Sequence, residues 1–404
     1  MSKQRLWVVS ELYYPEETST GYFVTHIAQG LAGDFEVMAL CSPPTYSERG
    51  LKVPARERHG GVDIIRTRST TFDKDRLPGR LLNLVTFTLG VMWHSLIGMK
   101  RGDRVLVLTN PPTLPALVGL IARLKGAKPY LLVHDVYPEV LVATGMVKEG
   151  GLAARAIGAL IDATYSLYEK VVVLGRDMAV IARRRFDGDA KRVAIIPNWG
   201  DLDEVKPLDH ADNPFALLNN PQRRAIVQFS GNIGRTHDVE TILEAARALG
   251  ERDDIAVQFV GYGGKAGLVS KAEEPGISLT YLPRQPREML PGMLSGADAV
   301  VIAFVDKMLG VSVPSRMYNV MSAGTAIIAM AHAASELAQV VAEEGCGWVL
   351  APGDVDGLAE LMRHIATPEG RADAAARGLR GREAVARSYS LPTVVEDFRK
   401  LLTN

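Results

Sequence analysis

Cysteine is scarce in this sequence: Cys41 and Cys346 are the two cysteines among 404 residues, and neither lies in a CxxC pair. Neither a disulfide framework nor a zinc site is indicated, and a reducing cytoplasm is the expected setting. Lys and Arg number 46, as do Asp and Glu, which argues against a general excess of positive charge for gripping nucleic acid. The N-terminal residues carry neither a long apolar stretch nor a small-residue cleavage site, so we expect no secretion signal.

Long uninterrupted apolar runs are also missing. The segment Leu81–Gly98 has no charged residue, but polar side chains interrupt it, whereas a membrane-spanning helix needs ~20 predominantly apolar residues. Residues 49–104 contain 12 Lys plus Arg and 5 Asp plus Glu, and the charges that flank the segment are Lys74, Arg76, Arg80, Lys100, Arg101 and Arg104. Two interpretations stay open: a helix lying on an anionic membrane surface, or an ordinary helix packed on a sheet.

The chain is longer than one hydrophobic core usually supports, so two domains are expected. Short β-branched runs alternate with segments of helical period, which is typical of a parallel sheet covered by helices on both faces. In the first half, the predicted strands are Leu6–Ser10, Glu36–Cys41, Val62–Arg66, Val105–Thr109, Tyr130–Val133, Val171–Leu174 and Val193–Ile196.

The alternation of predicted strands and helices stops at Pro197–Pro221. This segment is rich in Pro, Asn and Asp, so it is predicted to connect two domains. The alternation then restarts with predicted strands at Ala225–Ser230, Ile255–Val260, Ile277–Tyr281, Ala299–Ala303 and Ala326–Ala329. We therefore predict a Rossmann-like domain at residues 1–200, a second at 201–385, and a C-terminal helix at 386–404 that packs back on the first domain.

The segment Val227–Ala245 runs a predicted strand into Gly231 and Gly234 and then into an amphipathic helix. Free backbone N–H groups and the helix dipole favour an anion at such a turn, and Arg235 and His237 add side-chain donors. The spacing is neither a Walker loop nor GxGxxG, so an ATPase or a dinucleotide site is not indicated.

Glycines and cations also follow the next two predicted strands. Phe259–Lys265 (FVGYGGK) repeats the pattern, and Leu282–Arg287 (LPRQPR) follows the strand after it. Because parallel strands end at one edge of a sheet, these loops should converge there. Arg, Lys and backbone amides are the groups that bind phosphate well, so a diphosphate is the expected ligand.

Five segments then match, in order, the motifs of a known family. In chain order the segments are His134–Glu139 (HDVYPE), Ile196–Asp203 (IPNWGDLD), Phe229–Arg235 (FSGNIGR), Phe259–Gly263 (FVGYG) and Pro314–Gly324 (PSRMYNVMSAG). The family motifs that they resemble are, in the same order, "DLWPE", "IPNGVD", "(Y/F)xGN(I/M)GR", "VGxG" and "PSKxxEYMAAG". The chain resembles the retaining glycosyltransferases of family 4, in the branch that builds exopolysaccharide and O-antigen and includes colanic-acid and N-acetylfucosamine transferases.

The resemblance implies an α/β GT-B fold: two facing Rossmann-like domains with parallel sheets and a C-terminal helical segment. It implies a UDP- or GDP-linked sugar as donor, bound by the C-terminal domain, and a lipid-linked saccharide as acceptor, bound by the N-terminal domain. It also implies no metal and no other cofactor, which agrees with the lack of paired carboxylates suited to Mg²⁺ at a strand end. We expect a cytoplasmic enzyme, peripheral on the inner face of the cytoplasmic membrane through residues 76–104.

By this resemblance, His134 helps orient the donor sugar, and Arg235 and Lys265 neutralise the departing diphosphate. The alternatives are a structural histidine and two solvated surface cations. Residues expected to bind the donor are Gly21, Gly231, Asn232, Gly234, Gly261, Tyr262, Gly263, Arg284, Gly310, Val311, Ser312, Ser315, Arg316 and Asn319. For Gly21 the alternative is a simple helix start near Ser19 or Thr20.

One departure from the family stands out. Aligned on the family's motif, Val311 and Asn319 occupy the positions of its two glutamates, so both carboxylates are absent. An amide can still bond a ribose hydroxyl, and the backbone amides of Gly310, Val311 and Ser312 can still approach the sugar and phosphate. The absence keeps two other functions open: a non-catalytic partner that binds a nucleotide sugar, and, further behind, a nucleotide-sugar 2-epimerase.

Overall fold

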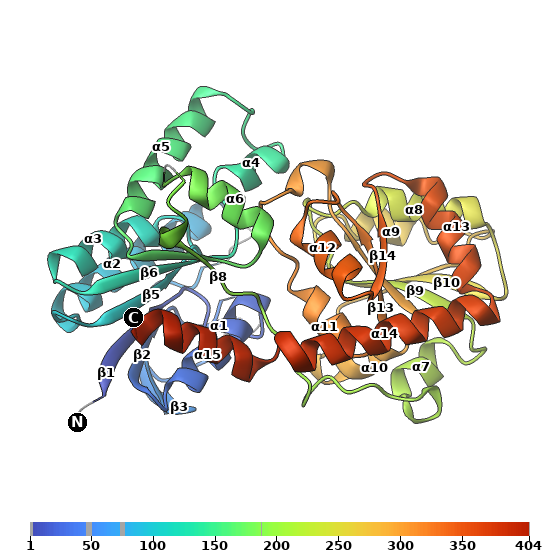
Figure 1. Ribbon diagram of the computed structural model, residues 1–404, viewed down its shortest axis with the longest axis horizontal. Coiled ribbons are helices and arrows are strands. Elements are labelled where there is room, and N and C mark those ends of the chain that lie inside the picture. The colour runs from blue at the N-terminus through green and yellow to red at the C-terminus, as the bar shows by residue number, and fades with distance from the viewer. Residues whose placement is uncertain (1–2, 46–50, 73–76, 187, 404) are drawn as a thin grey trace. The chain divides into compact units, whose positions relative to one another are not determined.

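The computed structural model of the protein describes residues 3–45, 51–72, 77–186 and 188–403 (Figure 1). Lys74 and Arg76, two of the basic flanking residues, lie outside the described residues. The chain forms two compact units. The first comprises Met1–Glu139, Lys148–Asn198 and Leu391–Asn404, and the second comprises Val140–Val147 and Trp199–Ser390.

The first unit is built on an eight-stranded sheet of order β3-β4-β2-β1-β5-β6-β7-β8, in which β3 alone runs antiparallel to its neighbour. Its strands are β1 (Gln4–Val9), β2 (Phe35–Cys41), β3 (Arg56–His59), β4 (Val62–Arg66), β5 (Arg104–Leu108), β6 (Lys128–Val133), β7 (Lys170–Val173) and β8 (Val193–Ile195). The strand order reverses between β1 and β5, which is where a doubly wound sheet opens a ligand-binding crevice.

Helices of the first unit form two layers. They are α1 (Ser19–Leu31), α2 (Leu77–Gly98), α3 (Leu114–Leu124), α5 (Leu152–Ser166), α6 (Arg176–Arg184) and α15 (Leu391–Thr403); α4 (Glu139–Ala143) begins at the edge of the unit. Helix α1 packs against α15, whereas α3 packs against both α2 and α5. Right-handed crossovers that run in opposite directions from the switch point place α1 and α3 on opposite faces of the sheet.

Helix α15 belongs to the first unit although it ends the chain, and Figure 1 shows it beside α1. A Cβ atom on Gly30 of α1 would lie 2.5 Å from Val395, so glycine is required where the two helices touch. Arg399 pairs with Asp34 at 2.8 Å, and the Arg104 Nε donates to the Leu402 carbonyl at 2.7 Å. These contacts fix the last helix to the first sheet. The preceding helix runs without interruption from Pro368 to Ser388, across the boundary expected at residue 385.

Helix α2 is the one helix, within the described ranges, that is long and apolar enough by length and composition to cross a membrane. Its inner side is buried, with Phe87 2% and Val91 0% exposed, and Gly90 fits closely against Thr67 just beyond β4. Because this side packs on the first unit, the interpretation as a packed helix is correct. Its outer side carries an exposed apolar stripe, which leaves a surface role open.

The second unit is built on a six-stranded, all-parallel sheet of order β11-β10-β9-β12-β13-β14. Its strands are β9 (Ala225–Asn232), β10 (Ile255–Tyr262), β11 (Leu279–Leu282), β12 (Ala299–Ala303), β13 (Ala326–Met330) and β14 (Gly347–Leu350). Its helices are α7 (Pro214–Asn219), α8 (Val239–Leu249), α9 (Ala266–Lys271), α10 (Leu290–Ser295), α11 (Arg316–Ser322), α12 (Glu336–Glu343), α13 (Val355–Ile365) and α14 (Pro368–Ser388). The order reverses between β9 and β12.

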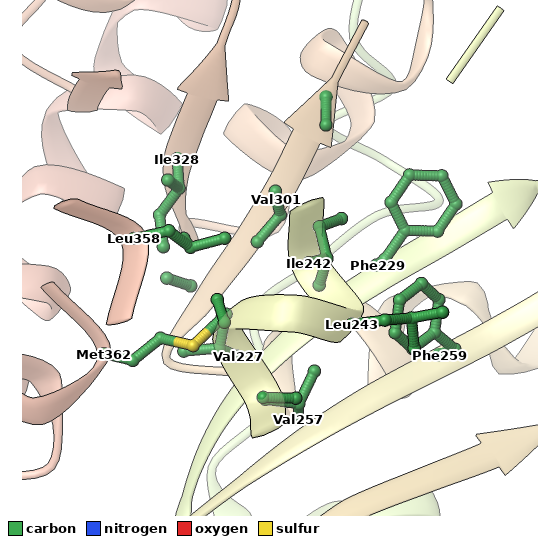
Figure 2. Packing of buried hydrophobic residues seen from close by; sticks show 14 of the residues in the cluster. Val227, Phe229, Ile242, Leu243, Val257, Phe259, Val301, Ile328, Leu358 and Met362 are labelled. Carbon is green, nitrogen blue, oxygen red and sulfur yellow. The ribbon is translucent and has the colours of Figure 1, made fainter. Parts of the chain in front are cut away.

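The core of the second unit lies between the sheet and two helices, α8 and α13. Figure 2 shows Val227, Phe229, Val257 and Phe259 from β9 and β10 meeting side chains of these helices, including Ile242 and Leu243 of α8 and Leu358 and Met362 of α13. All of them are at most 2% exposed. Each such side chain contributes roughly 1.5–3 kcal/mol when buried, so this core holds the strand ends in place.

All twelve predicted strands are present, with ends shifted by a few residues. Two strands were missed. Strand β3 (RERH) is a polar edge strand with no buried side chain, and β14 is an edge strand with one buried position. A hydrophobic pattern predicts a strand only where the strand's side chains are buried, so it misses edge strands with few buried side chains.

Candidate functional site

The loops after β9 and β10 lie together at the carboxyl edge of the second sheet. The Ile233 amide donates to the Tyr262 carbonyl at 2.7 Å, and the Lys265 amide donates to the Ile233 carbonyl at 2.9 Å. A Cβ atom on Gly261 would lie 1.9 Å from the Gly231 carbonyl oxygen. The two loops therefore pack backbone against backbone, and glycine at position 261 is a steric requirement.

The loop after β9 is also tied to β12 across the switch point. The Asp238 amide donates to the Ala303 carbonyl at 3.3 Å, and the Val305 amide donates to the Thr236 carbonyl at 3.1 Å. Asp238 caps α8 by accepting from the Thr241 amide. The loop is thus held from both sides before any ligand binds.

Arg316, at the start of α11, is the cation at the centre of this edge. Its guanidinium donates to the carbonyls of Ser230 at 2.7 Å and Asn232 at 3.2 Å, and it lies 4.8 Å from the centre of the Phe229 ring. Its guanidinium also donates to His237 Nε2 at 2.9 Å. Among the residues that the structure describes, no carboxylate pairs with it. Burial lowers the Arg316 pKa to about 10, so it remains charged at neutral pH.

His237 supports Arg316 and does not face a ligand through Nε2. Arginine has no acceptor, so Nε2 must accept and the proton of the neutral ring must be on Nδ1. The ring is 7% exposed, and burial, then the charges of Arg316 and Lys265, lower the His237 pKa to about 2. The prediction that His237 offers a donor to an anion is therefore wrong at Nε2.

The two other predicted cations differ in their surroundings. Arg235 is exposed on the loop after β9 and has no side-chain partner among the described residues. Lys265 is held: its Nζ donates to the His237 carbonyl and to Glu240 Oε2, both at 2.8 Å. A ligand can therefore bind Arg235 without breaking an ion pair. Lys265 is already paired with Glu240, which joins its loop to α8.

Further donor-binding candidates line the same edge. Asn232, Gly234 and Gly263 belong to the loops described above, and a Cβ on either glycine would crowd the Asn232 side chain. Tyr262 is 52% exposed, and the Arg284 guanidinium lies 5.5 Å from the centre of its ring. An exposed aromatic ring with a cation on it offers a flat, polarisable surface beside the phosphate-binding groups.

The segment between β12 and α11 carries the remaining candidates. Gly310 has a positive φ of 72°, and the Val311 amide already donates to the Met308 carbonyl at 3.1 Å. Val311 is also 2% exposed, so neither its side chain nor its amide faces a ligand here. Ser312, Ser315 and Asn319 are half-buried. Asn319 lies on α11, one turn after Arg316.

His134 and Gly21 lie in the first unit. His134 directly follows β6, its amide donates to Thr109 Oγ1 at 3.3 Å, and its Nε2 is shielded from solvent without a partner among the described residues. Burial lowers the His134 pKa to about 4, and the neighbouring Asp135 is exposed. A neutral imidazole and a carboxyl group thus stand side by side at a strand end.

Gly21 lies in the first turn of α1. The helix is capped by Thr18, whose Oγ1 accepts from the Gly21 amide at 3.3 Å. The amide of Gly21 is therefore used in capping, which favours the structural interpretation. A Cβ at this position would lie 2.8 Å from the Glu16 carbonyl, so glycine is needed for close packing.

The structure brings together Gly231, Asn232, Gly234, Arg235, Gly261, Gly263, Lys265 and Arg316, which all belong to the second unit. His134 and Gly21 belong to the first unit, at the carboxyl ends of its strands. The support that His237 gives Arg316 was missed. The spacing of these residues, nearly eighty positions apart, gave no signal for it.

Two doubly wound, mainly parallel sheets, with a glycine-rich, cationic loop cluster at the switch point of the second, are typical of the GT-B class of glycosyltransferases. The "Glycosyl transferase 4-like domain" profile matches residues 20–199, and the "Glycosyl transferases group 1" profile matches residues 212–379. The chain is 31% identical over 365 residues to the probable glycosyltransferase WbjE of Pseudomonas aeruginosa, with 89% of each chain covered. The chain therefore belongs to the group 1 glycosyltransferases, and the resemblance to family 4 is confirmed.

Other similar proteins agree with this assignment. The putative colanic acid biosynthesis glycosyl transferase WcaI of Escherichia coli K12 is 26% identical over 368 residues, covering 87% of this chain and 89% of its own length. Sucrose-phosphate synthase from Thermosynechococcus elongatus has a similar fold, with a TM-score of 0.75 at 18% identity, covering 99% of this chain and 98% of its own. Anabaena HepE, solved with UDP and glucose, has a TM-score of 0.70 at 11% identity over 99% of this chain and all of its own. These two structures support the fold.

Proposed function

We propose that this glycosyltransferase moves a sugar from a UDP- or GDP-linked donor to a lipid-linked saccharide, with retention of anomeric configuration, during synthesis of a bacterial surface polysaccharide. The observation that carries the proposal is the uncompensated charge of Arg316, which lies under the glycine loop with carbonyls and a neutral imidazole as its partners. A cation that is held without a counter-ion at a strand end favours an anionic ligand.

The arrangement suits a departing diphosphate. When the bond between the anomeric carbon and the diphosphate breaks, negative charge grows on the leaving oxygen, and the acceptor's hydroxyl oxygen bonds the same carbon while its proton goes to the diphosphate. Arg316 offers that oxygen a positive charge in a position that is fixed beforehand, which is the largest contribution to many enzymatic rates, and the exposed Arg235 adds a second positive charge. Asn319 and the exposed Tyr262 are suited to ribose and base.

The first unit supplies the groups proposed to orient the sugar and bind the acceptor. A neutral His134 with an unpartnered Nε2 can hydrogen-bond a sugar hydroxyl, and its low pKa keeps it neutral over the physiological range. The outer stripe of α2 offers an apolar surface to a membrane-bound acceptor. The name of the relative WcaI, a putative colanic acid biosynthesis glycosyl transferase, supports a role in polysaccharide synthesis. We place this role at the inner face of the cytoplasmic membrane because of the exposed apolar stripe on α2.

The test is a donor screen followed by a transfer assay. UDP, GDP and their sugars are compared for the rise in melting temperature, since a ligand that binds only the folded state stabilises it. The winning donor is then incubated alone and with lipid-linked saccharides, and release of the nucleotide diphosphate is measured. No thermal shift with any nucleotide, or a shift that persists unchanged in Arg316→Met, contradicts the proposed donor site.

A non-catalytic, nucleotide-sugar-binding partner is the second candidate, and the missing glutamates at positions 311 and 319 favour it. This candidate predicts tight donor binding with neither sugar transfer nor slow donor hydrolysis. Detecting a transferred sugar or a hydrolysed donor therefore excludes it. A 2-epimerase predicts an epimerised donor sugar in the absence of acceptor, which the same incubation detects by chromatography.

A further inference from the structure

A second cationic site lies at the outer edge of the first sheet, away from the switch point. It is a pocket of about 800 Å³ between the pair β3–β4 and helix α2. Its charged lining comes from Arg56 on β3, from Arg66 and Arg68 at the end of β4, and from His94 on α2. None of these residues is part of the proposed donor site.

Two of the three arginines in this pocket are uncompensated. Arg66 is 4% exposed and structural, because it pairs with Glu57 at 2.5 Å and donates to the carbonyls of Pro54 and Tyr14 at 2.8 Å each. Arg56 and Arg68 are exposed and have no carboxylate partner among the described residues. The described lining residues therefore carry an excess of two positive charges, which matches a diphosphate better than a single phosphate ester.

The pocket continues into an apolar surface. The stripe on the outside of α2 consists of side chains 41–63% exposed, spaced mainly three or four residues apart: Leu81, Leu82, Val85, Leu89, Trp93, Leu96 and Ile97. Leu89 and Trp93 also line the pocket. A ligand that fills the pocket with its anionic group is therefore guided to lay a hydrocarbon chain on the stripe.

The position in the sheet fits the acceptor. The pocket lies at the carboxyl end of β4, and His134 lies at the carboxyl end of β6, along the same edge. Four strand spacings of about 4.8 Å separate β4 from β6, so the ends of these two strands are about 19 Å apart in the sheet. A saccharide chain can bridge this distance along the sheet edge.

We propose that the β4–α2 pocket binds the diphosphate of the lipid-linked acceptor through Arg56 and Arg68, while the acceptor's isoprenoid-type chain lies on the α2 stripe. This inference rests on the proposed function for the saccharide end of the acceptor. The binding of the diphosphate and lipid is separate from catalysis and is tested without it.

Farnesyl diphosphate is the probe, and Trp93 is the reporter. Trp93 is 63% exposed in the pocket wall, Trp7 and Trp199 are at most 2% exposed, and the half-buried Trp348 belongs to the second unit. A change in tryptophan fluorescence that disappears in Trp93→Phe therefore reports the pocket. We expect farnesyl diphosphate to bind at least about tenfold more tightly than farnesol or inorganic diphosphate, because charge and apolar contact add. The affinity should fall as salt is raised.

The test variant carries both Arg56→Ala and Arg68→Ala, and the control variant carries Arg58→Ala alone. Both target arginines are exposed, so folding should be unaffected, and Arg58 is an exposed neighbour on β3 that pairs with Asp63 and lies outside the pocket. The double variant should weaken binding about tenfold or more, whereas Arg58→Ala should not. Arg235→Glu should bind farnesyl diphosphate normally, which separates this pocket from the donor site.

Three results overturn the inference: equal binding of farnesol and farnesyl diphosphate, unchanged affinity in the double variant, or a dimer that forms through the stripe and excludes the probe. The dimer would show in sedimentation and would be lost in Leu89→Ser. Donor-dependent transfer activity with any of these results leaves the proposed function standing. Binding as expected without transfer activity supports the pocket and counts against the proposed function.

Discussion

At the scale of single residues, the relation between Arg316 and His237 organises the donor edge. Arg316 holds the glycine loop through two carbonyls, and the neutral ring of His237 fixes the guanidinium from the other side. The charge is therefore oriented before a ligand arrives. A charge that is already oriented stabilises a transition state without the free-energy cost of reorienting the charged group during the reaction.

Replacing Arg316 by Met should lower kcat/KM for transfer by about 100-fold or more, because one fixed cation at the leaving group is lost. It should also lower the free energy of unfolding by about 1–3 kcal/mol, since buried acceptors lose their donor. Steady-state kinetics and urea unfolding measure the two effects. Arg247→Met, on the exposed side of α8, is the matched control and should change neither. Wild-type kinetics in Arg316→Met would remove this residue from the mechanism.

His237 should make stability depend on pH. Its pKa is about 2 in the folded protein and about 6.5 when unfolded, so the unfolded state binds the extra proton below pH 6.5. The stabilisation is complete above pH 6.5 and is lost as the pH falls. Between pH 6.5 and 5.5 the loss should be about 1 kcal/mol, rising toward about 1.4 kcal/mol per pH unit at lower pH, and His237→Asn should reduce it. Urea unfolding at several pH values measures this slope, and an equal slope in the variant would contradict the assignment.

At the scale of elements, two helices decide what the first unit can do. Helix α2 has one buried side and one exposed apolar side, so it serves both as a core helix and as a surface. Helix α15 returns the chain end to α1 and closes the layer that α1 begins. Each of these helices packs closely because a glycine lies at the contact. Gly90 of α2 lies against Thr67, and Gly30 of α1 lies against Val395 of α15.

Replacing Gly30 by Leu should push α15 away from α1, because even a Cβ atom would lie 2.5 Å from Val395. We expect destabilisation of about 1–3 kcal/mol, as for other overpacked contacts, and faster proteolysis within residues 391–403. Limited proteolysis with mass spectrometry measures it. Gly33→Ala, three residues further on with open space around it, is the control and should be cut at the wild-type rate.

At the scale of the whole molecule, the two units have separate sheets and separate cores. If the second unit binds the donor, a nucleotide should protect β9, β10 and α11 most strongly from hydrogen exchange, while β3, β4 and the outer side of α2 should respond to farnesyl diphosphate. Hydrogen exchange with each ligand in turn measures this. Protection of the same peptides by both ligands would contradict the assignment of two sites.

Much of this protein could be predicted from sequence because buried strands repeat a strong apolar pattern. All the strands of that kind were found, whereas the polar edge strand β3 was not. At the site, the glycine and cation motifs predicted that their loops converge, and the structure places Gly231 against both Gly261 and Arg316, while the role of these residues in binding stays a prediction. The motifs did not show that Lys265 is paired with Glu240 or that the Val311 amide is occupied.

The sequence by itself determined the fold class, the family and the loops that carry charge, since these follow from local pattern and from motifs read in order. Only the tertiary structure decided which cations are uncompensated. Charge compensation depends on residues far apart in the chain, as with Arg316 and His237, or Lys265 and Glu240. It also decided that one side of α2 is exposed beside a pocket whose Arg56 and Arg68 have no carboxylate partner in the part of the chain that the structure describes, because exposure and pairing are properties of packing.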